Sequence, residues 1–120
     1  MAGRGNPHAK MKYEELVKNG INSALRRDMN DSRLTFVTIT KVELTEDYAN
    51  AKVWWDTFDS SKRGEISEAI DAVKGRIRTL LASRLEVRHT PELLFIYDSQ
   101  YEDEQRIDKI LKGERGDNEE

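Results

Sequence analysis

The chain contains no cysteine among its 120 residues. Disulfide bonds, thiolate catalysis and cysteine-based zinc sites are therefore excluded, and a reducing compartment suits this composition. Histidine is also scarce. With only His8 and His89, a nucleophile paired with a histidine base would need a partner that no motif indicates. The acidic run at residues 102–104 has the spacing of a solvated surface. We therefore expect no enzyme, no metal and no cofactor.

Long hydrophobic runs are missing too, and none is long enough to span a bilayer. The first ten residues, MAGRGNPHAK, have no apolar core and are not a secretory signal. The hydrophobic fraction is 37% and the charged fraction is 36%. These features predict one small, highly charged domain in the cytoplasm, without a membrane partner and monomeric when free.

The net charge of -3 hides an uneven distribution along the chain. Residues 1–90 hold 16 Lys or Arg and 13 Asp or Glu, which gives +3, whereas residues 91–120 hold 4 and 10, which gives -6. Within residues 74–90, five cations face a single acid, Glu86. Such a segment can be a solvated face or a surface that binds a polyanion, and composition alone leaves both readings open.

Apolar spacing of three and four residues predicts an amphipathic helix over residues 11–29. Residues rich in β-branched side chains follow at 34–45, and residues 51–58 alternate, so we expect a long β-hairpin. A change of phase near Thr40 or Lys41 indicates a β-bulge. Trp55 is expected in the core. Trp54, on the opposite sheet face, is either structural or a platform on which a base could stack.

Two helices are predicted over residues 62–74 and 75–85, meeting at a kink at Gly75. One helix that tolerates a glycine is the alternative. Residues 87–97 predict a third strand, and a short helix ends near Gly113. The fold class is therefore α+β, with a three-stranded sheet and helices on one face. Residues 1–10 form a flexible arm, 11–112 the domain, and 113–120 an acidic disordered tail.

Several segments in this order resemble the ribosome-binding factor A family, which has a KH-like fold of the second type. DSRL at residues 31–34 is similar to the family's D-P-R-L. The two strands carry the family's spaced positions, filled here by Thr45, Asp47, Ala51 and Val53. GRIRTLLASRLEVRHTPELLFIYD matches the glycine, the I-R pair, the leucines, P-E-L and the final aspartate. The resemblance covers about residues 12–111 and implies the order α-β-β-α-α-β.

The family has an A-x-G kink where ordinary KH domains carry a Gly-x-x-Gly loop that clamps nucleic acid. Here the triplet is Val73-Lys74-Gly75, so the alanine position departs from the family. The resemblance implies an assembly factor, without catalytic activity, that binds the small (30S) ribosomal subunit and its 16S rRNA during late maturation, including processing of the rRNA 5' end. The alternative is a general KH-like RNA-binding or protein-interaction module.

With this resemblance, the basic segment is predicted to contact RNA. Cations and hydroxyls on one exposed helical arc suit phosphate and ribose. A second basic cluster lies around the end of the first helix, where dipole or ion-pair roles are equally open. Arg84 lies nearer the apolar side and is expected to be structural. The predicted RNA-binding residues are Lys74, Gly75, Arg76, Arg78, Thr79, Ser83, Arg88, Arg26, Arg27 and Arg33.

Overall fold

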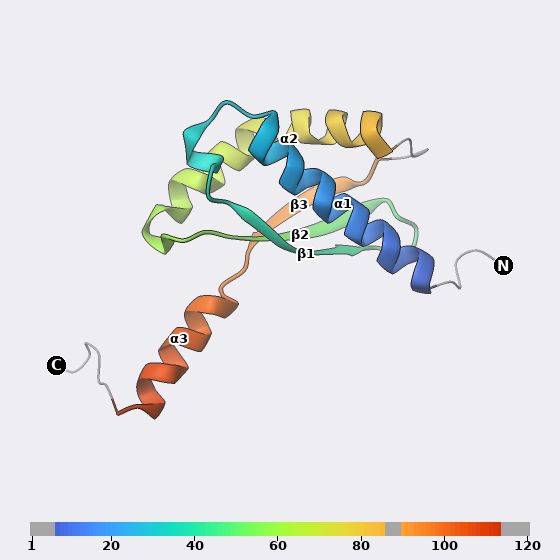
Figure 1. The fold of residues 1–120 in the computed structure, drawn as a ribbon. Helices are drawn as coiled ribbons and strands as arrows, with labels where there is room; N and C mark the ends of the chain where they lie inside the picture. The colour runs from blue at the N-terminus through green and yellow to red at the C-terminus, as the bar shows by residue number, and fades with distance from the viewer. Residues whose placement is uncertain (1–6, 86–89, 114–120) are drawn as a thin grey trace.

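The computed structural model describes residues 7–85 and 90–113. Two long helices cover one face of a three-stranded sheet, and a third helix stands apart from them (Figure 1). The elements are α1 (Pro7–Arg27), the 3-10 turn η2 (Ser32–Leu34), β1 (Thr38–Leu44), β2 (Asn50–Asp56), the 3-10 turn η3 (Ser60–Lys62), α2 (Arg63–Leu85), β3 (Glu92–Tyr97) and α3 (Gln100–Leu111). The predicted α+β class is confirmed.

The sheet has the order β1-β2-β3, with β1 antiparallel and β3 parallel to β2. The parallel pair requires the crossover through α2. The register shifts between Ile39 and Lys41, so the predicted bulge is confirmed. Trp55 is buried in the core as predicted, whereas Trp54 lies on the other face with the ammonium of Lys41 5.0 Å from its ring centre.

The core lies between the sheet and the helices. Its members come from the apolar stripes that the sequence predicted on α1 and α2 and from the inward face of each strand. The fully buried side chains include Ile21, Ile39, Val53, Ile70 and Ile77. Burying apolar surface of this kind contributes roughly 25 cal/mol per Å². This packing fixes which face of α2 is left for solvent.

Polar side chains of α1 form hydrogen bonds with backbone groups at the outer edge of β1. The Asn22 side chain accepts from the Ile39 amide at 2.9 Å and donates to the Ile39 carbonyl at 3.3 Å. The Leu44 amide donates to the Glu14 carboxylate at 2.9 Å. Because an open strand edge invites pairing with other chains, these bonds protect one edge of the sheet.

The motif positions Thr45 and Asp47 build the β1–β2 turn. The Thr45 hydroxyl and the Ala49 amide both donate to Asp47 Oδ1, at 2.8 and 3.0 Å. The Asn50 amide donates to the Thr45 hydroxyl at 3.1 Å. Tyr48 takes a left-handed backbone with φ of 62°, which the surrounding bonds hold in place. Thr45 and Asp47 therefore set the hairpin.

The starts of three elements differ most from the prediction. Helix α1 begins at Pro7, within the predicted arm, because proline suits the first turn of a helix. Strand β1 begins only at Thr38, since Asp31 caps the turn η2 by accepting from the Arg33 amide. Strand β3 begins at Glu92, after Pro91. The rest of the predicted arm, residues 1–6, and the tail after Gly113 lie outside the described residues.

The two helices predicted around Gly75 form one hydrogen-bonded helix, α2, so the predicted break is wrong. The axis of α2 nevertheless changes direction near its middle (Figure 1), so its two halves retain the order α-β-β-α-α-β. Gly75 has an ordinary helical backbone, and the Thr79 hydroxyl donates to the Gly75 carbonyl at 3.1 Å. A hydroxyl that bonds back to the preceding turn bends a helix without ending it.

Candidate nucleic-acid interface

The solvent side of α2 carries a ridge of small residues. Because six apolar side chains, among them Val73, Ile77 and Leu81, point into the core, the opposite arc of α2 is exposed. Small side chains on that arc let a sugar-phosphate backbone approach the helix closely. We call this arc the α2 ridge, and its exposed members are Ala72, Gly75, Thr79, Ala82 and Ser83.

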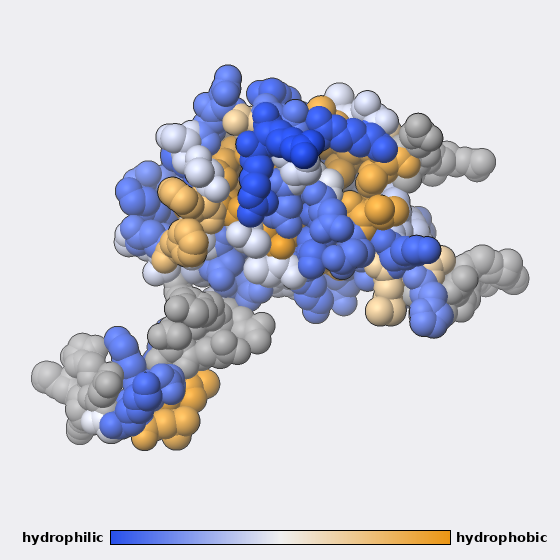
Figure 2. All heavy atoms as spheres, in the orientation of Figure 1, coloured by the Kyte–Doolittle hydropathy of each residue, from blue (hydrophilic) through white to orange (hydrophobic). Residues whose placement is uncertain are grey.

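One flank of the α2 ridge joins the C-terminal end of α1 through Asp28. Arg76 donates to the Asp28 carbonyl at 3.1 Å, and Arg84 Nη1 lies 2.9 Å from Asp28 Oδ2. The Arg84 guanidinium beside Asp28 and the nearby arginine charges lower the pKa of Asp28, although partial burial acts in the opposite direction. The predicted structural role of Arg84 is confirmed. Strongly hydrophilic side chains gather over this part of α1 and α2 (Figure 2).

The other flank faces the segment that leads into β3. Arg78 donates from Nε to the Pro91 carbonyl at 3.0 Å and from Nη2 to the Thr90 carbonyl at 2.7 Å. The Glu92 carboxylate lies 3.5 Å from Arg78 Nη1. Lys74 lies one turn before Arg78 and is half-buried. Arg78 therefore holds the start of β3 against α2 while keeping its positive charge near the α2 ridge.

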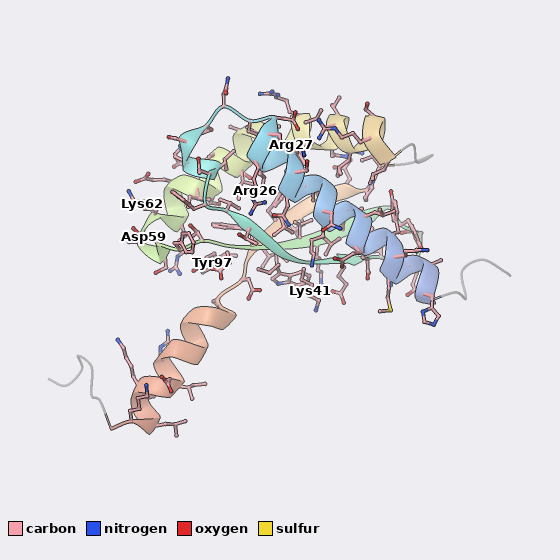
Figure 3. The ribbon with its side chains drawn as sticks, in the orientation of Figure 1. Arg26, Arg27, Lys41, Asp59, Lys62 and Tyr97 are labelled. Atoms are coloured by element: carbon pink, nitrogen blue, oxygen red, sulfur yellow. The ribbon has the colours of Figure 1, made fainter. Side chains whose placement is uncertain are left out.

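The structure brings together most of the predicted RNA-binding residues. Thr79 and Ser83 lie on the α2 ridge, with Arg76 on one flank and Lys74 and Arg78 on the other. Arg26 and Arg27 are exposed on the last turn of α1, which packs against α2 (Figure 3). The Arg26 guanidinium donates to the Asn22 carbonyl at 3.3 Å.

Arg33 is not part of this arrangement. Arg33 forms an ion pair of 2.7 Å with Asp31 and donates to the Glu65 carbonyl at 3.5 Å. Glu65 lies ten residues before Gly75, which is about 15 Å along a helix. Arg33 therefore lies at the far end of α2. The prediction for Arg88 falls outside the described residues.

Sequence reasoning missed Asp28 as the point where Arg76 and Arg84 meet. The helical pattern shows on which face of α2 each arginine lies, but it does not show which segment of the chain passes that face. A weak signal was available, because Asp28 directly follows Arg26 and Arg27 at the end of the first predicted helix. An acid at that place is unfavourable for the helix dipole and indicates another partner.

Within residues 7–85 and 90–113, leaving out the side chains of residues 100–105, no cluster of three or more His, Cys, Asp or Glu side chains is arranged to hold a metal ion. The same residues contain no helix of the length and hydrophobicity needed to cross a membrane.

A three-stranded mixed sheet with two helices on one face, a bent second helix and cations on both flanks of its exposed ridge defines a KH-like domain. Residues 9–111 match the model of the ribosome-binding factor A family. The chain belongs to this family.

Individual relatives agree with this assignment. The chain is 37% identical to ribosome-binding factor A of Halothermothrix orenii over 99 residues, covering 82% of this chain and 81% of that protein. The crystal structure of ribosome-binding factor A from Thermus thermophilus superposes with a TM-score of 0.67 and 24% identity, over 73% of this chain and 93% of that chain. A model of the Thermus thermophilus protein, fitted into a cryo-EM map of a 30S–RbfA complex, gives a TM-score of 0.57 and 23% identity, over 71% and 90% of the two chains.

Proposed function

We propose that this protein is a ribosome assembly factor that binds the small ribosomal subunit through its 16S rRNA during late maturation, including processing of the rRNA 5' end. The observation that carries the proposal is the α2 ridge with cations of α1 and α2 on both flanks. Membership of the family and the 30S complex of the Thermus thermophilus relative support it.

In this proposal, the α2 ridge lies against a segment of rRNA backbone. Arg26, Arg27 and Arg76 contact phosphates on one flank, and Lys74 and Arg78 contact phosphates on the other. Phosphate contacts set position and orientation without reading sequence. The hydroxyls of Thr79 and Ser83 are placed to bond ribose or phosphate oxygens. The protein works by binding, without a catalytic step, as a monomer in the cytoplasm.

Binding to purified small subunits tests this proposal. The full chain should co-sediment with 30S subunits, and cells that lack it should accumulate 16S rRNA with an unprocessed 5' end. Normal rRNA ends in such cells would contradict the role in processing. Absence of co-sedimentation at low salt would contradict the role on the subunit.

The second candidate is a KH-like protein-interaction module without a ribosomal role. The face of the sheet opposite the helices favours it, because Leu94 is 56% exposed there and Trp54 is only half-buried. Salt dependence separates the two candidates. Binding that neutralises several phosphates falls steeply as salt rises, whereas an apolar protein interface is much less sensitive.

A further inference from the structure

Helix α3 lies on the side of the sheet opposite α1 and α2, and its own apolar stripe is uncovered (Figure 1). Ile107, Ile110 and Leu111 are 56%, 65% and 79% exposed. Their spacing of three and four residues puts them on one face of the helix, as in helices that pack on a protein core. Figure 2 shows this apolar surface on α3, separate from the body of the molecule.

The open face of the sheet carries a small apolar patch among exposed charged and polar side chains. Leu94 and Ile96 alternate with inward-facing neighbours along β3, so both point away from the core. Trp54 is the β2 residue in register with Ile96, and Lys52 is in register with Leu94. The apolar stripe of α3 and this patch of the sheet lie on the same side of the sheet (Figure 1). Only residues 98 and 99 connect β3 to α3.

We propose that α3 docks on this open face and that the Ile107, Ile110 and Leu111 stripe covers Leu94, Ile96 and Trp54. The proposal concerns a second surface of the molecule and does not depend on RNA binding at the α2 ridge.

The lengths of the two elements match this docking. Ile107 lies eight residues after Ser99, about 12 Å along a helix. Leu94 lies four residues before Asp98, about 13 Å along a strand. A helix running back along β3 would therefore bring Ile107 level with Leu94 and place Leu111 near the start of the strand. The twelve residues of α3 span about 18 Å, close to the length of the six-residue β3.

The connection between β3 and α3 also limits where α3 can turn toward the sheet. The Asp98 amide donates to the Trp55 carbonyl at 2.7 Å, and the Thr40 hydroxyl donates to Asp98 Oδ2 at 2.7 Å. The chain is thus held to the sheet as far as Asp98, and α3 begins two residues later. A change of backbone direction around Ser99 is sufficient to bring α3 onto the sheet, and connections of two residues between a strand and a helix are common.

Because the chain contains no cysteine, two introduced cysteines are the only thiols in a disulfide crosslinking test. The variant Leu94→Cys/Ile107→Cys should form an intramolecular disulfide with oxidised glutathione several-fold faster than Leu94→Cys/Lys109→Cys. Lys109 is the matched control because it lies on the opposite side of α3. Equal rates for the two variants would overturn the proposal. Disulfides formed only between molecules would also overturn it, since a second copy would then occupy the sheet.

A second measurement keeps the proposal testable if the crosslinked variants fold poorly. In the single variant Leu94→Cys, a thiol reagent should react slowly. Adding Ile107→Asp and Ile110→Asp, which leaves the body of the protein unchanged, should increase the reaction rate several-fold. An unchanged rate would show that α3 does not cover Leu94.

Discussion

Gly75 lies on the exposed α2 ridge with a helical backbone and open space where a Cβ would stand. Alanine loses less conformational entropy than glycine in a helix. Gly75→Ala should therefore raise the free energy of unfolding by about 0.5–1 kcal/mol, measured by thermal or denaturant unfolding. A loss of stability would show that the bend in α2 needs a backbone that alanine does not adopt.

The same substitution tests whether the α2 ridge faces RNA. The added methyl group should weaken binding to small subunits several-fold, because it separates the helix from the nucleic-acid backbone. Gly64→Ala is the matched control, since Gly64 also lies in α2 with open space around it but near the first turn. If Gly75→Ala and Gly64→Ala bind equally well, the α2 ridge is not in contact with RNA.

Asp28 gives the protein a pH dependence on the acid side. Its pKa is lowered from the ordinary 3.8, first of all by the Arg84 guanidinium paired with it. Between the folded and unfolded pKa values the unfolded chain binds more protons. The stabilisation is therefore present above about pH 4 and lost as pH falls through the folded pKa. The pKa values of Asp31, Asp47 and Asp59 are lowered as well, so their contributions have the same sign.

We expect Asp28→Asn to flatten the decrease of unfolding free energy below about pH 4, measured by denaturant titration at several pH values. Arg84→Gln removes the donor that lowers the pKa and should flatten it in the same way. A slope identical to that of the unchanged protein in both variants would contradict the assigned ion pair.

At the scale of elements, Gly20 sets the distance between α1 and α2. A Cβ at Gly20 would lie 2.8 Å from Leu81 Cδ2, and Leu81 is itself buried in the core. Gly20→Ala should therefore destabilise the protein by about 1–3 kcal/mol, although alanine favours the helix. Gly75→Ala, in α2, is expected to raise the free energy of unfolding. The two glycine-to-alanine substitutions should therefore change stability in opposite directions.

A double-mutant cycle checks this contact. Leu81→Val shortens the side chain that meets the new methyl group, so Gly20→Ala should cost less in that background than alone. Strictly additive effects would show that the two residues do not limit the approach of the helices.

How far the sequence predicts these elements depends on the kind of signal. The stripe through Ile66, Ile70 and Ile77 predicted the buried face of α2, because periodicity reports burial directly. The change of phase at Thr40 predicted the bulge in the same way. The start of β1 was placed too early, since the capped turn at Ser32–Leu34 depends on one hydrogen bond from the Arg33 amide to Asp31.

The sequence predicts the contacts within the candidate site less well than the helix faces on which its residues lie. The helical pattern placed Arg76 and Arg78 near an exposed arc, but their partners are backbone carbonyls of Asp28, Thr90 and Pro91, in other elements. Every residue has a backbone carbonyl, so such contacts cannot be predicted from residue types. The close packing at Gly20 is not predictable for the same reason, since the neighbour of Gly20 lies in α2.

For the whole molecule, the cations around the α2 ridge are proposed to bind 16S rRNA. Arg76 and Arg78 are poor choices for a test because their guanidinium groups also hold backbone carbonyls. Among the residues that the structure describes, the side chains of Arg27 and Lys74 form no ion pair or hydrogen bond. They can therefore be changed with the least damage to the fold. Lys52 and Lys62 serve as controls, since one lies on β2 and the other in the turn η3.

The most direct measurement is the affinity for small subunits as a function of salt. Arg27→Ala and Lys74→Ala should each lower the slope of log affinity against log salt by about 0.7–0.9, if each side chain neutralises one phosphate. Arg27→Glu/Lys74→Glu should remain folded and lose co-sedimentation with 30S subunits, while Lys52→Glu/Lys62→Glu, with the same change in net charge, should bind normally. A folded Arg27→Glu/Lys74→Glu variant that binds with unchanged affinity and slope would contradict RNA binding at the α2 ridge.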